Sequence, residues 1–270
     1  MDRASMEYVK VVVRRLYDAQ KLRIQSDLRM QRLIRDEIVL KENAEKTFKK
    51  AFELETQIEH EYEKIIWREI KGMPIIDRWL IRIRGIGPRL GGLLVANILD
   101  IERFATVSKL WAYCGLHVID GKAAKRRKGE KCNWSQELKT TAWKIGQSFL
   151  KVGGPYRELY DTYRQYLITR ELGNGSIIWK GDEKNREVAF APKALAVKDL
   201  KPPKLPEWTL GRIHNMATRR TVKIFLSHLW QVWREIEGLP VGGPFVKERL
   251  GHESMIDPWK MIEVEATKVA

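Results

Sequence analysis

The first 71 residues contain no glycine and no proline. Arg, Lys, Glu, Gln and Leu dominate this segment, which is a composition typical of a long helix. Apolar residues recur at three- and four-residue steps and so form a stripe along one side of the helix. The stripe includes Val9, Val13, Leu16, Ile34, Ile38, Phe48, Phe52, Ile58, Tyr62 and Ile66. Such a helix needs a partner. Either a second chain pairs with it in a coiled-coil homodimer, or the segment folds back near Glu42-Asn43 as a helical hairpin.

Gly72 and Pro74 end this segment, because glycine favours a helix C-cap and proline cannot continue the hydrogen-bonded ladder. Short helical patterns follow, and glycines and prolines then punctuate two strand-like runs before a last long helix. The sequence predicts a mainly α chain with a small β-hairpin or loop insertion. Its expected parts are a coiled-coil segment (1–71), a helix-hairpin-helix domain (72–172), the insertion (173–207), a long basic helix (208–240) and an irregular tail (241–270).

Lysine and arginine outnumber aspartate and glutamate by 50 to 35, which gives a formal net charge of +15 and a pI near 9.7. This excess favours a polyanionic partner, although a solvated basic surface is the alternative. No apolar run approaches the ~18 residues that span a bilayer, and no signal-peptide core follows Met1. We therefore expect a cytoplasmic protein whose partner is DNA or structured RNA.

The turn that contains Arg84, Gly85, Ile86, Gly87 and Arg89 fits the helix-hairpin-helix pattern of sequence-independent DNA binding. Glycines allow the backbone to approach a phosphate closely, and unpaired N–H groups at the start of the next helix donate to its oxygens. The two arginines would add positive charge. The alternative is an ordinary tight turn between two helices.

Two further basic segments are candidates for contact with a phosphate backbone. The first is a loop with glycine at both ends and tryptophans nearby, and the second is one face of the last helix. Solvent-facing basic stripes are the alternative in both cases. The candidate residues are Lys122, Lys125, Arg126, Arg127, Lys128 and Lys131 in the loop, and Arg212, Arg219, Arg220 and Lys223 on the helix.

We assign no catalytic residue, no metal site and no cofactor from the sequence. Cys114, His117 and Cys132 lack a fourth ligand and fit no common zinc spacing. His214 and His228 lie on the last helix, where histidines are usually packing residues. No set of carboxylates in apolar strands suggests a site for two divalent ions.

Three sequence blocks carry a resemblance to a known family. They are residues 83–88 (Ile-Arg-Gly-Ile-Gly-Pro), 100–104 (Asp-Ile-Glu-Arg-Phe) and 110–116 (Leu-Trp-Ala-Tyr-Cys-Gly-Leu). The region resembles the C-terminal transposase domain of bridge-RNA-guided insertion-sequence transposases, which also carry a RuvC-like DEDD domain. The basic stretches 131–143 and 217–220 are similar to later helices of that family, and the N-terminal helix is similar to its coiled coil.

Two departures from the family shape the functional expectation. The RuvC-like domain with its metal-binding carboxylates is not in this sequence. The family's nucleophilic serine follows the Gly-Leu pair closely, whereas residues 117–121 contain no serine, and Ser108 and Ser135 lie outside that position. The first hypothesis is thus a transposase-derived protein that binds nucleic acid without strand transfer. The alternatives are a recombinase with its nuclease supplied by another chain, or a coiled-coil scaffold for a protein partner.

Overall fold

A computed structural model describes residues 3–119, 121–126, 129, 131–182, 185–192, 203–204, 206–241 and 256–262. The chain is mainly α-helical, as the sequence predicts. Its helices are α1 (Arg3–Arg35), α2 (Lys41–Ile70), α3 (Pro74–Arg78), η1 (Leu80–Arg82), α4 (Pro88–Ile98), η2 (Ile101–Arg103), α5 (Val107–Tyr113), α6 (Gln136–Val152), α7 (Pro155–Gly173), α8 (Leu210–Ile236) and η3 (Pro258–Met261). Two short antiparallel hairpins pair β1 (Val118–Ile119) with β2 (Lys122–Ala123), and β3 (Ile178–Lys180) with β4 (Glu187–Phe190).

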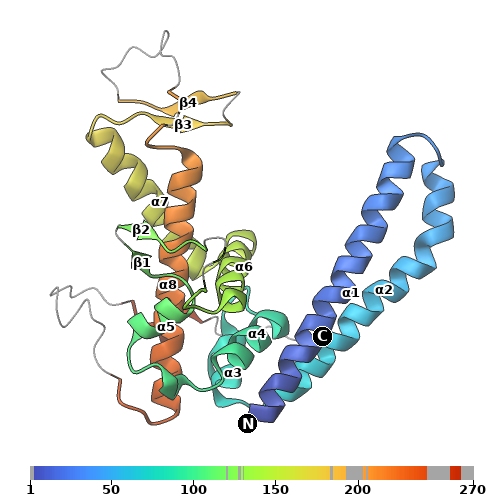
Figure 1. The fold of residues 1–270 in the computed structure, drawn as a ribbon, viewed down its shortest axis with the longest axis horizontal. Helices are drawn as coiled ribbons and strands as arrows, with labels where there is room; N and C mark the ends of the chain where they lie inside the picture. The colour runs from blue at the N-terminus through green and yellow to red at the C-terminus, as the bar shows by residue number, and fades with distance from the viewer. Residues whose placement is uncertain are drawn as a thin grey trace.

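The N-terminal segment is a helical hairpin, in which α2 returns alongside α1 (Figure 1). The turn falls a few residues before the expected Glu42-Asn43. Glu37 adopts a left-handed φ of +56°, and the Ile38 N–H donates to the carbonyl of Leu33 at 3.0 Å, which closes the end of α1. This bond lets the chain reverse without glycine. Of the two alternatives that the sequence left open, the structure of the single chain shows the helical hairpin.

The apolar stripe of this hairpin is buried only at its base. Val9, Leu16 and Ile66 belong to the main hydrophobic core together with residues of α3, α4, α6 and α8. Toward the tip, Phe48 and Ile58 are exposed. The base of the hairpin is therefore part of the folded core. The rest of α1 and α2 projects from the core, and we call this part the arm (Figure 1).

A second elongated part consists of α7 and α8, with the β3–β4 hairpin at its far end (Figure 1). A smaller hydrophobic cluster joins them, and its buried members are Leu167, Ile168, Ile178, Trp208 and Ile213. The predicted β-hairpin insertion is confirmed at β3 and β4. It extends the surface of α8 beyond the main core.

Side-chain caps set the start of the helices that border the functional region. The hydroxyls of Thr106, Ser135 and Thr209 accept hydrogen bonds from backbone N–H groups in the first turns of α5, α6 and α8. Among the described residues, no helix combines the length and apolar character needed to cross a membrane.

Candidate nucleic-acid interface

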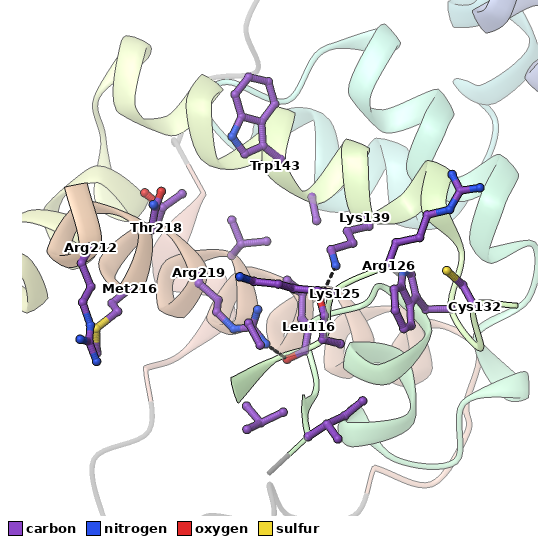
Figure 2. A pocket seen from close by; sticks show the side chains of 18 of the residues that line it. Leu116, Lys125, Arg126, Cys132, Lys139, Trp143, Arg212, Met216, Thr218 and Arg219 are labelled. Carbon is purple, nitrogen blue, oxygen red and sulfur yellow. Dashed lines mark hydrogen bonds between the residues drawn. The ribbon is translucent and has the colours of Figure 1, made fainter. Parts of the chain in front are cut away.

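An open groove lies between α6, the first half of α8, and the β1–β2 hairpin with the loop that follows it (Figure 2). α6 contributes Lys139, Trp143 and Gln147 from one face, at four-residue intervals, and α8 contributes Arg212 and Arg219. The groove has a volume of about 1630 Å³, whereas pockets for small molecules measure ~300–1,000 Å³. Its size and openness suit an extended ligand better than a compact metabolite.

The described lining of the groove is strongly basic. It contains six cations and no aspartate or glutamate. None of these cations forms an ion pair with a carboxylate of the described residues. Uncompensated charges of one sign in a concave surface attract a polyanion. The six cations are Lys125, Arg126, Lys131, Lys139, Arg212 and Arg219.

Lys139 binds the basic loop to α6, and Arg219 binds the segment before β1 to α8. Lys139 Nζ donates to the Ala124 carbonyl at 2.7 Å, and Arg219 Nη2 donates to the carbonyls of Leu116 and His117 at 2.7 and 2.9 Å (Figure 2). Burial lowers the pKa of both side chains, and the charge of Arg219 lowers the pKa of Lys139 further. A bound anion would stabilise both charged forms.

The other four cations are more exposed. Lys125, Arg126, Lys131 and Arg212 all present their side chains to solvent. The guanidinium of Arg212 lies 4.5 Å from the centre of the Trp208 ring, which fixes its direction at the end of the groove. Solvated lysines and arginines of this kind follow a phosphate backbone without reading its sequence.

The structure thus brings together five of the residues that the sequence singled out. They are Lys125, Arg126, Lys131, Arg212 and Arg219. Sequence reasoning missed Lys139 and Trp143, because only the buried stripe of α6 was considered. The signal was present: Lys139, Trp143 and Gln147 repeat every four residues on the side of α6 away from that stripe.

The turn at residues 84–89 lies outside the groove. Gly85 has φ of +92°, and a Cβ there would come within 2.9 Å of both Ser148 Oγ and Val152 Cγ2. Ser148 Oγ also donates to the Gly85 carbonyl at 2.7 Å, and Ile86 is buried. Close packing against α6 therefore requires Gly85. Gly87, at the N-cap of α4, has no neighbour within 4 Å of an added Cβ and leaves its backbone open.

Arg89 points into the arm rather than to solvent. It binds the buried carboxylate of Glu59 at 3.3 Å and also pairs with Glu63, while Arg23 binds Glu59 from α1. Its charge is therefore matched by carboxylates within the chain. Arg84 is exposed and packs beside Gly154, where an added Cβ would lie 3.1 Å from its Cδ.

The remaining predicted contacts lie elsewhere. Arg220 lies over the Tyr163 ring at 4.0 Å, and Lys223 lies over the Trp111 ring at 3.8 Å. Both residues are on α8 beside the groove, but neither is among its lining residues. Burial and Arg219 lower the pKa of Lys223. Arg127 and Lys128 lie outside the described residues, and Lys122 is placed by its backbone in β2 only.

We next consider the side chains near the groove that could act in catalysis, among the described residues. Burial raises the pKa of the Cys114 thiol to about 12, which keeps it protonated. Both ring nitrogens of His117 are buried and lack a hydrogen-bond partner in the described part of the chain. Ser135 serves as the N-cap of α6 and accepts from the Leu138 N–H at 3.2 Å. No cluster of three or more possible metal ligands occurs among the residues that the structure describes.

Comparison with known families finds a match to the transposase IS116/IS110/IS902 family over residues 77–161. The matched region runs from α3 into α7 and includes the turn at 84–89, the basic loop and all of α6. Residues 77–161 are therefore similar to a transposase family, in agreement with the transposase part of the resemblance seen in the sequence. A search of curated proteins finds no match to this chain.

Proposed function

We propose that this chain is a transposase-related protein that binds the phosphate backbone of nucleic acid through the groove between α6, α8 and the basic loop. The observation that carries the proposal is the set of six cations, none matched by a described carboxylate, in an open groove within and beside the transposase-family region. A transposase-related protein acts on DNA, so the proposal includes a cytoplasmic, nucleoid-associated location.

The test is a binding titration at low salt with duplex, branched and structured nucleic acids. Replacing Lys125, Arg126 and Lys131 with alanine should weaken binding on the order of tenfold or more and flatten the slope of log affinity against log salt. The matched control replaces three exposed cations of the arm, Arg15, Lys21 and Lys50, which changes net charge equally. Equal effects of the two triple variants would contradict a specific groove, and absence of binding by the unaltered chain would overturn the function.

We also propose that the chain binds without strand transfer of its own. Two observations support this: the described groove lining contains no serine and no carboxylate, and the Ser135 hydroxyl is engaged as a helix cap. Nucleophilic catalysis needs an activated hydroxyl or thiol. The buried Cys114 thiol is held protonated, which leaves the free Cys132 thiol as the one thiol among the described lining residues. A strand-cleavage assay with Mg²⁺ is the test, and a trapped covalent adduct between protein and DNA would refute this part of the proposal.

Homodimerisation through the arm completes the proposed function. The tip of the arm holds an apolar groove of about 840 Å³ between α1 and α2, with Met30, Leu33, Phe48 and Phe52 in its lining. The described side chains of this tip include several exposed apolar groups that the single chain does not cover. A second copy of the same arm would bury them in a bundle of four helices.

A further inference from the structure

Trp143 is the most exposed tryptophan of the chain. Its exposed fraction is 61%, and Trp259, at 41%, is the next. The other eight tryptophans are buried or half-buried. Several of these hold their indole N–H in a hydrogen bond, as Trp79, Trp111 and Trp230 do. Most tryptophans are therefore packed at least partly in the interior, whereas Trp143 lies on the surface.

The position of Trp143 separates it from an ordinary surface aromatic residue. It forms one edge of the basic groove, and Lys125, Lys139 and Arg219 lie toward the centre (Figure 2). Lys139 and Gln147, one turn to each side on α6, line the same groove. An aromatic ring beside unmatched cations is the combination used to hold unpaired nucleotides, because the ring stacks on a base while the cations hold the phosphates.

A second observation comes from the interior of the groove. Thr218 of α8 lines it and is 8% exposed, and its Oγ1 is buried with no hydrogen-bond partner among the described residues. A buried hydroxyl normally has a partner, and leaving one unmatched costs ~1–3 kcal/mol. Its neighbour across the helix interface is Gly146, where an added Cβ would meet Thr218 Cγ2 at 2.6 Å. The unmatched hydroxyl is thus held at the junction of α6 and α8.

We propose that the groove binds an unpaired polynucleotide strand, with one base stacked on Trp143 and the adjoining phosphates held by Lys139, Arg219 and Lys125. A duplex keeps its bases stacked on each other and offers an edge aromatic residue no free base face, whereas an unpaired strand exposes both base and backbone. A rotation of the Thr218 side chain would bring its buried, unmatched hydroxyl to the groove surface, where it can donate to the polar edge of the bound nucleotide. This inference rests on the proposed function and specifies its substrate class.

The test measures fluorescence anisotropy with labelled oligonucleotides of equal length: single-stranded DNA, single-stranded RNA, duplex DNA, and a single strand whose sugars carry no bases. The unaltered chain should bind both kinds of single strand more tightly than the abasic strand by about tenfold or more. Trp143→Ala should lose that advantage, and Trp143→Phe should keep most of it. On the abasic strand and the duplex, Trp143→Ala should change affinity less than about twofold, since neither offers a base to stack.

Trp259→Ala is the control for removal of an exposed indole, because Trp259 lies on η3 and not in the groove lining. Thr218→Val keeps the shape of the side chain and removes the unmatched hydroxyl, so its thermal stability should be equal or higher while single-strand affinity falls a few-fold. A role in packing alone would leave the affinity unchanged, because valine keeps the shape of the side chain.

The outcomes separate this inference from the function on which it depends. If no oligonucleotide binds, the proposed function fails. If binding depends on Lys125, Arg126 and Lys131 but is indifferent to bases and to Trp143, the function stands and the stacking site is overturned.

Discussion

Gly85 and Gly87 are both part of one short turn, yet their surroundings differ. Gly85 holds a φ of +92° against Ser148 and Val152, whereas Gly87 has φ of −104° and open space around it. We expect Gly85→Ala to lower the free energy of unfolding by at least ~1–2 kcal/mol, the cost of a left-handed backbone for an L-residue. Gly87→Ala should cost less, within ~1 kcal/mol, which is the order of the difference between glycine and alanine at an N-cap. Urea unfolding followed by circular dichroism measures both.

The same pair of variants tests the turn as a phosphate contact. Because Gly87→Ala should remain folded, a loss of duplex affinity in that variant reports on close approach of a backbone phosphate to the start of α4. Unchanged affinity would assign the turn a structural role alone. A variant with both glycines changed could not make this distinction, because unfolding and lost binding would occur together.

His228 gives a residue-scale prediction about pH. Its Nδ1 accepts from the buried Tyr156 hydroxyl at 2.9 Å in the tautomer that leaves this nitrogen unprotonated. Burial lowers its pKa from 6.5 to about 4. A histidine with a lowered folded pKa contributes full stability above pH 6.5, where both states are neutral. That stability falls as the pH drops toward 4, because the unfolded chain then gains a proton that the folded chain excludes.

The expected size of this effect is ~1.4 kcal/mol per pH unit in that window, or about 2 kcal/mol between pH 6.5 and 5. Urea unfolding at the two pH values measures it. Replacing His228 with glutamine keeps a side-chain oxygen that can accept from Tyr156 and removes the titration, so the variant should lose less stability than the unaltered chain over the same interval. An identical pH dependence in both proteins would show that His228 does not carry the effect.

At the scale of elements, the contact between α6 and α8 shapes the groove. An added Cβ at Gly146 would lie 2.6 Å from Thr218 Cγ2 and 3.1 Å from Val222 Cγ2. We expect Gly146→Ala to force the helices apart at a cost of ~1–3 kcal/mol and to weaken nucleic-acid binding through the altered groove. Gly173→Ala, at the exposed end of α7 with no atom within 4 Å of an added Cβ and outside the groove lining, is the control. Equal melting temperatures of the two variants would show that the contact between α6 and α8 at Gly146 tolerates an added Cβ.

The elements themselves were largely predictable, because their signals are local. Glycine and proline at 72–74, the caps Thr106 and Thr209, and the change of pattern after Gly173 each depend on a few neighbouring residues. The reversal of the first helix was harder to place, since its turn uses Glu37 in a left-handed conformation rather than a glycine. Helix propensity does not predict a left-handed conformation at a glutamate.

The site was only partly predictable, because it depends on contacts between distant segments. Charge alone marked Arg89 and Arg126 as equal candidates, yet Glu59 and Glu63 pair with the first and no described carboxylate pairs with the second. These partners lie 26 and 30 residues from Arg89 and act through tertiary structure. Trp143 likewise becomes informative only once α8 and the basic loop are seen beside it.

At the scale of the whole molecule, the two projecting parts differ in how far their apolar side chains are covered. The far end of α7 and α8 is covered by its own hydrophobic cluster and the β3–β4 hairpin, whereas the arm of α1 and α2 ends with exposed apolar side chains. A single exposed apolar residue is common, but a lined apolar groove indicates an interface. The proposed homodimer would cover this tip and leave the basic groove, on the other part of the molecule, free in each copy (Figure 1).

We therefore expect Leu33→Glu with Phe48→Glu to convert a dimer into a monomer in sedimentation equilibrium. At protein concentrations below the dimer Kd the melting temperature should change little, because both side chains are exposed in the single chain. Above that concentration, loss of the dimer should lower it. Tyr8→Glu, at an exposed position near the base of the same helix, should leave the dimer intact. Two grooves held in one dimer also raise the effective concentration for a strand long enough to reach both. The monomeric variant should thus lose affinity for long strands by ~10²-fold or more and keep its affinity for short ones. Equal losses for both lengths would show that the arm acts on the groove itself and does not join two copies.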